Sequence, residues 1–208
     1  MGRDKAAVLL AGRTLLDHML SKMDALGMDA HVAGIATASR PGAMHAVADQ
    51  QIGCGPMSGL ETALRCSQNT LVMLLGIDLP LVSAGFLNGL LRRANMTGAL
   101  ATIPRVTGRP QPLCAVYRRD LAPAVGRMLQ AGTLKMMHGV ERAIEATGGR
   151  LDIFDVENVV AAGNLTLARP AMWEFLNCNT PADLELAERL LQKQAPQALP
   201  ESDRPHML

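Results

Sequence analysis

Asp78 is the acidic residue best placed to do chemistry, because it directly follows the apolar run of residues 71–77. The run does not alternate between polar and apolar side chains, which predicts a strand buried on both faces, as in a parallel sheet. Ligands of open α/β sheets bind beyond the carboxyl ends of such strands, and Pro80 turns the chain away from a helix. Asp78 is therefore placed to hold a hard cation such as Mg²⁺ against substrate phosphates. A carboxylate that only caps the turn is the alternative interpretation.

A glycine-rich stretch and a second carboxylate precede this strand. Gly55 and Gly59 let the backbone approach a ligand closely, and Pro56 suits the first turn of a helix. The start of that helix would offer N–H groups and a positive dipole end to an anion or to the edge of a base. Asp49 follows the short apolar segment 46–48 and stands at another expected strand end. Ordinary turn chemistry is the alternative for both features.

Polar side chains on two later loops complete the set of candidates. Arg109 lies in the loop 104–112, where its guanidinium suits a phosphate and suits solvent equally well. Thr180 begins a near-complete capping box for a helix that runs to residue 194. The capping box does not explain Asn177 and Asn179, although turn chemistry accounts for either one.

Strands alternate with helices along the chain, and this order predicts a three-layer α/β/α sandwich with a mostly parallel sheet. We expect one domain over residues 1–194, followed by a disordered tail over 195–208. The expected strands are 31–37, 46–48, 71–77, 98–103, 113–117 and 151–156, and the expected helices are 14–26, 61–66, 83–95, 121–130, 134–146 and 180–194.

The composition argues against several classes of protein. The 20 Lys and Arg residues nearly balance 19 acidic residues, and a formal charge of +1 is not typical of nucleic-acid binding. No apolar run approaches the roughly 18 residues that span a bilayer, and no signal peptide opens the chain, so we expect a cytoplasmic protein without membrane contact. The four cysteines form no C-x-x-C pair and the five histidines show no metal-binding spacing, which argues against a zinc or redox site.

Four stretches taken together resemble the molybdenum cofactor guanylyltransferases. They are Met-Gly-Arg-Asp-Lys-Ala at 1–6 with Gly-Arg-Thr-Leu-Leu-Asp-His at 12–18, Gly-Pro-Met-Ser-Gly-Leu at 55–60, Asp-Leu-Pro at 78–80, and Asn-Cys-Asn-Thr-Pro at 177–181. The similarity covers almost the whole chain except the tail, and its motifs are more specific for the superfamily than for the base. It implies a Rossmann-like fold of the nucleotide-diphospho-sugar transferase type.

The resemblance implies an enzyme that joins GMP from GTP to the terminal phosphate of molybdopterin, with Mg²⁺, and releases pyrophosphate. Carried over by motif, Asp78 would bind the metal and Lys5 would contact the nucleotide phosphates, and these two would be the catalytic residues. Such transfer depends on charge neutralisation and alignment, so we expect neither a serine nor a cysteine nucleophile. Molybdoenzymes or other cofactor-biosynthesis proteins are the partners implied.

The remaining site residues are also assigned by the resemblance. Asp49 would lie near the guanosine, and Arg109 would face the pterin side. The nucleotide would lie along Gly55, Pro56 and Gly59, and the pterin side or the metal would be faced by Asn177 and Asn179.

The start of the chain departs from the family pattern. Family members begin with a strand and a Leu-Ala-Gly-Gly-x-Ser-x-Arg loop whose amides cradle the phosphates, and residues 1–5 match the end of that signature. We therefore expect this chain to lack the first strand and the phosphate loop, through an upstream native start or through real loss. Aligning residues 8–13 with the first strand and loop is the alternative, but residues 14–18 then lose their match.

Two other functions remain open at this point. A cytidylyl- or sugar-nucleotide transferase of the same fold is the first, and the stretch at 55–60 favours guanylyl transfer over it. A catalytically inactive nucleotide-binding module is the second, and only the missing loop favours it.

Overall fold

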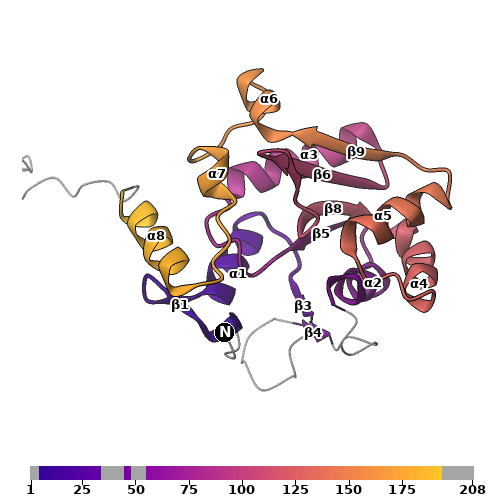
Figure 1. Ribbon diagram of the computed structural model, residues 1–208, viewed down its shortest axis with the longest axis horizontal. Coiled ribbons are helices and arrows are strands. Elements are labelled where there is room, and N and C mark those ends of the chain that lie inside the picture. Colours follow the sequence, from indigo (N-terminus) through magenta and orange to yellow (C-terminus); the bar gives the residue numbers. More distant parts are fainter. Residues whose placement is uncertain (1–4, 34–44, 48–54, 194–208) are drawn as a thin grey trace, which may run out of the picture.

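A five-stranded sheet with helices on both faces forms the centre of the molecule (Figure 1). The computed structural model describes residues 5–33, 45–47 and 55–193. The sheet consists of β5 (Leu71–Leu75), β6 (Ala101–Val106), β7 (Arg109–Pro110), β8 (Cys114–Arg118) and β9 (Leu151–Asp155). β8 lies between β5 and β6, β7 continues along β6 where β8 ends, and β9 pairs with the other edge of β6.

Most strands of this sheet point the same way, although most neighbouring strands are antiparallel. β5, β6 and β9 point the same way, because β8 is antiparallel to both β5 and β6 while β9 is parallel to β6. Short connections from β6 through β7 to β8 require antiparallel neighbours. The α/β/α class is therefore confirmed. Three of the five strands, β5, β6 and β9, point the same way, as a mostly parallel sheet requires, but among the described residues only the pair of β6 and β9 consists of parallel neighbours.

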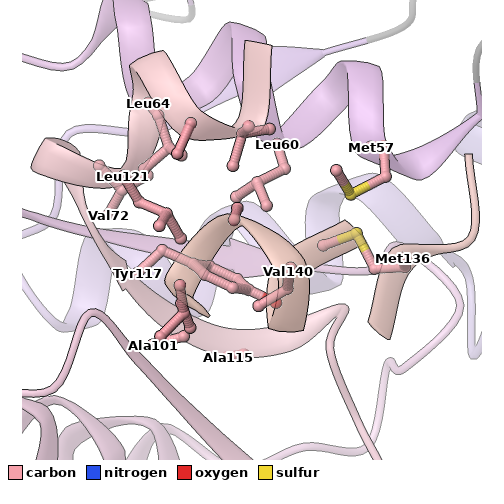
Figure 2. Packing of buried hydrophobic residues seen from close by; sticks show 14 of the residues in the cluster. Met57, Leu60, Leu64, Val72, Ala101, Ala115, Tyr117, Leu121, Met136 and Val140 are labelled. Atoms are coloured by element: carbon pink, nitrogen blue, oxygen red, sulfur yellow. The ribbon is translucent and has the colours of Figure 1, made fainter. Parts of the chain in front are cut away.

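One face of the sheet is covered by α2 (Pro56–Cys66), α4 (Ala122–Gln130) and α5 (Met136–Glu145). Ala115 and Tyr117 of β8 point into this cluster, as period-two alternation requires. Figure 2 shows Tyr117 among leucines and methionines of the helices. Aliphatic side chains and methionines therefore fill most of the space that aromatic rings occupy in other cores.

The opposite face is covered by α3 (Ala84–Thr97), with α6 (Val156–Ala161) and α7 (Ala171–Glu174) near its edge (Figure 1). The alternate β8 residues, Cys114 and Val116, belong to this second cluster. The two clusters confirm a sheet buried on both sides.

The amino-terminal segment packs against the carboxyl-terminal helix (Figure 1). The segment comprises a short helix η1 (Lys5–Ala7), a hairpin of β1 (Leu9–Leu10) and β2 (Arg13–Thr14), and helix α1 (Leu15–Ala25). Its partner is α8 (Pro181–Gln192), which contacts β1. Leu10, Leu15 and Ala187 are buried together in this contact.

Thr14 and Thr180 begin their helices as expected, each in a complete capping box. The side-chain oxygen of each threonine accepts the N–H of an aspartate three residues on, Asp17 and Asp183 respectively. Such caps typically contribute about 1 kcal/mol. Both helix starts were therefore readable from local sequence.

The loop predicted over 104–112 is wrong, because Pro104 lies inside β6. β8 pairs with β6 only at Ala101 and Thr102, and β7 pairs only at Arg105 and Val106. Pro104 occupies the gap between these pairings, so its missing N–H removes no bond from that edge.

A separate parallel pair joins β3 (His31–Ala33) to β4 (His45–Val47).

Asp49, Cys54 and the expected tail 195–208 lie outside the described residues. The 3₁₀ helix η2 (Arg119–Leu121) links β8 to α4. In the part of the chain that the structure describes, none of the helices has both the length and the apolar character needed to cross a membrane.

Candidate active site

Asp78 lies in a pair of consecutive turns that leave the carboxyl end of β5. The N–H of Leu79 donates to the carbonyl of Gly76, and the N–H of Val82 donates to the carbonyl of Leu79. Pro80 lies in the second turn and ends the extended chain, as the sequence indicates. The carboxylate therefore stands at the sheet edge where α/β proteins bind ligands.

Lys5, Asp78 and Asn179 come together from distant parts of the chain. Lys5 Nζ donates to Asn179 Oδ1 at 2.6 Å and lies 3.8 Å from Asp78 Oδ2. The side chain of Lys5 is 43% exposed and that of Asp78 is 21% exposed, so solvent-borne ligands reach both. The grouping joins a cation, an anion and an amide oxygen at one point.

The backbone around Cys178 ties the asparagine loop to Asp78. The N–H of Cys178 donates to the carbonyl of Asp78 at 2.8 Å. Burial, together with nearby Asp183 and Asp78, raises the pKa of the Cys178 thiol to about 11. The thiol therefore stays protonated at neutral pH and is not an activated nucleophile.

A groove of about 700 Å³ begins beside Lys5 and runs along β5. Gly55, Pro56 and Gly59 line it together with Lys5, so these four predicted site residues share one cavity. No side chain among the described residues caps the start of α2 at Gly55, so the positive end of this helix lies beside the groove without a capping carboxylate from that part of the chain. The walls are mostly apolar and include Leu16, Met19 and Met23 of α1, and Thr62 and Ala63 of α2.

One edge of β5 faces this groove and has no partner strand in the described part of the chain. Among the described residues β5 pairs with β8 alone. Thr70 and Gly76 bond through their backbones to the residues that flank β8, and residues of an antiparallel strand alternate between its two edges. Leu71, Met73 and Leu75 therefore direct their N–H and C=O groups toward the groove.

A buried polar atom also lines the groove. Thr62 is 2% exposed, and its Oγ1 has no hydrogen-bond partner in the described part of the chain. His31 and Val32 of β3 contribute to the same lining. Within residues 5–33, 45–47 and 55–193, the groove thus combines apolar walls with backbone and hydroxyl groups that have no partner.

The structure leaves three predicted site residues apart from the Lys5 cluster or untested. Arg109 is exposed in β7, where its carbonyl accepts from Gln111 Nε2 at 3.2 Å. Asn177 is exposed in the loop before α8, two residues from Asn179, and its carbonyl accepts the N–H of Asn179. Asp49 lies outside the described residues.

Sequence reasoning missed the charged side chains that bind the backbone after Asp78. Lys22 of α1 donates to the carbonyl of Pro80, Arg169 donates to the carbonyl of Leu81, and Glu174 of α7 accepts from Ser83. Lysine in an amphipathic helix and arginine before a proline carry no sequence signal for such a role, since both contacts depend on tertiary packing.

The pKa of Lys22 reflects its surroundings. Burial, followed by the positive charges of Arg169 and Arg13, lowers the pKa of Lys22 to about 8, and the negative charge of Glu174 opposes this shift. Lys22 is therefore a lysine whose charge changes near physiological pH.

The donor set around Asp78 suits Mg²⁺ held jointly with a substrate. Over residues 5–33, 45–47 and 55–193 there is no cluster of three or more His, Cys, Asp or Glu side chains that could hold a metal. One carboxylate and one amide oxygen, at Asp78 and Asn179, are hard oxygen ligands of the type that Mg²⁺ uses alongside waters and phosphates. Lys5 lies between them and suits the negative charge of those phosphates.

Comparison with known proteins identifies the family. Residues 1–147 match the family model for the MobA-like NTP transferase domain. A probable molybdenum cofactor guanylyltransferase of Opitutus terrae is 26% identical over 194 residues, which cover 91% of this chain and 89% of that protein.

Two solved structures extend the comparison. Molybdopterin-guanine dinucleotide biosynthesis protein A from Archaeoglobus fulgidus has a TM-score of 0.74 and 25% identity, and covers 92% of each chain. The 2-C-methyl-D-erythritol 4-phosphate cytidylyltransferase of Thermus thermophilus has a TM-score of 0.66 and 19% identity, covering 90% of this chain and 94% of that one, and it supports the fold alone. The resemblance noted in the sequence is confirmed: this chain belongs to the MobA-like NTP transferase family and is a nucleotidyltransferase.

Proposed function

We propose that this protein transfers GMP from GTP to the terminal phosphate of molybdopterin and releases pyrophosphate. The observation that carries the proposal is the meeting of Lys5, Asp78 and Asn179 at the carboxyl end of β5. The names of the relatives support the choice of substrates.

The reaction is an in-line exchange at the α-phosphorus of GTP. An oxygen of the molybdopterin phosphate forms a bond to that phosphorus, and the bond to the oxygen bridging the α- and β-phosphates breaks. Pyrophosphate leaves with the electron pair of the broken bond. The acceptor phosphate is already ionised at neutral pH, so the protein supplies positions and charges rather than a base.

Each proposed residue has a part in holding the reactants. Lys5 Nζ is within reach of the region beside Asp78 and would contact the nucleotide phosphates. Asp78 would hold Mg²⁺, with Asn179 beside it, and the ion would neutralise charge on the phosphates. The apolar character of the nearby groove would strengthen these interactions by excluding water.

The start of α2 is the proposed guanine contact. Gly55 adopts a φ of 66°, which favours glycine, and a Cβ at Gly59 would have no heavy atom within 4 Å. Both positions therefore leave backbone open to a base edge at close range. We assign Asp49 to the guanosine, and Arg109, Asn177 and Asn179 to the pterin side, as the family motifs suggest.

The groove beside β5 supports a further part of the proposal, that an amino-terminal strand and phosphate loop belong in front of residue 1. Lys5 lies at the carboxyl end of β5, so a strand running parallel to β5 through the groove would end next to the first described residue. The unpaired edge of β5 would bond to it.

A cytidylyltransferase is the second candidate, because the Thermus thermophilus enzyme has the same fold and one fold can carry several chemistries. The decisive experiment incubates the protein with Mg²⁺, molybdopterin and GTP, CTP or ATP in parallel, and measures pyrophosphate release and the dinucleotide formed. We expect release with GTP that depends on molybdopterin. Release with CTP in preference would establish the second candidate, and nucleotide binding without release in any mixture would establish an inactive module.

A further inference from the structure

Most backbone hydrogen bonds of the segment between Asp78 and α3 are made with groups from elsewhere in the chain. The carbonyl of Asp78 accepts from Cys178, that of Pro80 accepts from Lys22 Nζ at 2.7 Å, and that of Leu81 accepts from Arg169. Among the described residues, one backbone turn bond lies within the segment itself, from the N–H of Val82 to the carbonyl of Leu79 at 3.3 Å, and a second at 3.3 Å joins the N–H of Leu79 to the carbonyl of Gly76 just before the segment. Its shape therefore depends on its partners rather than on its own hydrogen bonds.

Glu174 closes the end of this segment. It is 0% exposed, and its Oε2 accepts from the N–H and the hydroxyl of Ser83, which caps α3. Its Oε1 accepts the N–H of Ala168 at 2.6 Å. A buried carboxylate thus links α7, the segment around Arg169 and the start of α3.

Two cations beside this carboxylate direct their donors to adjacent carbonyls. Lys22 Nζ also donates to the carbonyl of His18 at 3.1 Å, so the amine is hydrogen-bonded to α1 as well as to the carbonyl of Pro80. Hydrogen bonds to charged groups contribute about 1.5–3 kcal/mol each. Two such bonds, to Pro80 and Leu81, act within three residues of the Asp78 carboxylate.

The same contacts of Lys22 would also be expected if its role were purely structural, as a link that holds α1 against the core. The two roles differ in what they control. A link of this kind changes global stability alone, whereas a support for the turn changes the position of Asp78 in molecules that remain folded.

Resting on the function proposed above, we propose that Lys22 and Arg169 are positioning residues, which hold the turn after β5 so that Asp78 presents its carboxylate to the metal and the phosphates. Partners that orient a metal-binding carboxylate typically change metal affinity or activity by about 10–100-fold when removed. The same range is expected for each of these two residues.

The test uses the full chain with Lys22→Met, which keeps an unbranched stem and removes the donor, and Lys22→Arg, which keeps a charged donor. Lys135→Met is the matched control, because Lys135 is exposed at the start of α5. Mn²⁺ binding in the presence of GTP is followed by electron paramagnetic resonance. Amide exchange of Leu79 and Val82 reports on the turn itself.

We expect Lys22→Met to weaken Mn²⁺ binding by about 10–100-fold and to speed exchange of both amides, while Lys22→Arg recovers most of each and Lys135→Met changes neither. Arg169→Gln is the second variant and should act in the same direction if Lys22→Met fails to fold. A lower melting temperature with unchanged Mn²⁺ binding and unchanged turn exchange would reduce Lys22 to a structural link. If the unaltered protein with GTP binds no Mn²⁺, the proposed function fails, and the exchange measurement still decides whether Lys22 holds the turn.

Discussion

An added amino-terminal strand should dock in the groove beside β5 and protect one specific set of amides. The perturbation is a fusion in which an apolar strand of about six residues is joined to residue 1 through a Gly-rich loop. Leu71, Met73 and Leu75 turn their N–H groups to the groove, whereas Val72 and Leu74 already face β8. We therefore expect alternating protection along β5 before the fusion, and uniform protection after it.

The magnitudes show why the added strand must be apolar. Three residues of β5 offer six backbone groups to a new neighbour, and at about 0.5–1.5 kcal/mol each these bonds contribute about 3–9 kcal/mol. Ordering the backbone of a strand that spans β5 costs about 1–2 kcal/mol per residue, which offsets most of that gain. Burial of apolar side chains against Leu16 and Met19 on one wall and Ala63 on the other must supply the surplus.

Hydrogen exchange and thermal unfolding measure the same docking free energy. A tenfold slowing of exchange at the three edge amides corresponds to about 1.4 kcal/mol, which for a chain of this size raises the melting temperature by about 3–6 °C. A fusion of equal length built from Ser and Thr is the control, and a proline at the centre of the apolar strand is a second control, since it removes a ladder donor.

Equal protection of Leu71, Met73 and Leu75 and of Val72 and Leu74 before any fusion would show that the groove edge of β5 is already paired. Equal melting temperatures of the apolar and the polar fusions would show that the apolar strand does not dock. Docking should further tighten GTP binding, because loop amides placed near Lys5 and Asp78 would surround the phosphates. Full activity and tight GTP binding without any fusion would instead mean that residues 8–13 serve as the phosphate loop.

Three further predictions follow from the site. Lys5→Met should change the melting temperature by only a few degrees, because an ion pair this exposed contributes about 0–1 kcal/mol. The same substitution should lower kcat by about 10–150-fold, because a charged hydrogen bond to phosphate is lost. A loss of kcat no larger than the loss of folded protein would argue against a catalytic role. Activity should fall as pH rises through about 8, where Lys22 loses its charge, and a pH–rate profile unchanged by Lys22→Met would contradict this. The contribution of Lys22 to the free energy of unfolding should instead rise between pH 8 and 10.5. In that range the unfolded chain holds the proton on Lys22 and the folded chain does not. Cys178→Ala should keep its kcat, since the protonated thiol of Cys178 takes no part in transfer, and a loss above tenfold in the folded variant would point to a covalent step.

Local sequence was enough to predict the features that depend on neighbouring residues. The apolar run ending at Asp78 did form a strand followed by a turn, and the capping boxes at Thr14 and Thr180 begin α1 and α8. Pro56 is the first residue of α2, as the Gly-Pro pattern indicated. In each case the determining groups lie within a few residues of one another.

Features that depend on distant contacts were not predictable in this way. Pro104 suggested a loop, but the switch of β6 from one partner strand to another gives a place where its missing donor costs nothing. Lys22 of α1 and Arg169 both bind the turn after Asp78, and each lies more than fifty residues from its partner in the chain. No spacing in the sequence indicates these contacts. Lys5 and Asn179 were assigned to the site through the family resemblance, and their contact with each other was not predicted.

The proposed role of Asp78, to hold the metal during transfer from GTP, can be tested by a titration with Mg²⁺. Pyrophosphate release from GTP and molybdopterin is titrated with Mg²⁺ for the unaltered protein and for Asp78→Asn, which keeps the size of the side chain and removes its charge. We predict that Asp78→Asn keeps its melting temperature within a few degrees and releases no pyrophosphate above background at any Mg²⁺ concentration. Turnover in Asp78→Asn with the same dependence on Mg²⁺ as the unaltered protein would contradict the account and remove Asp78 from the metal site.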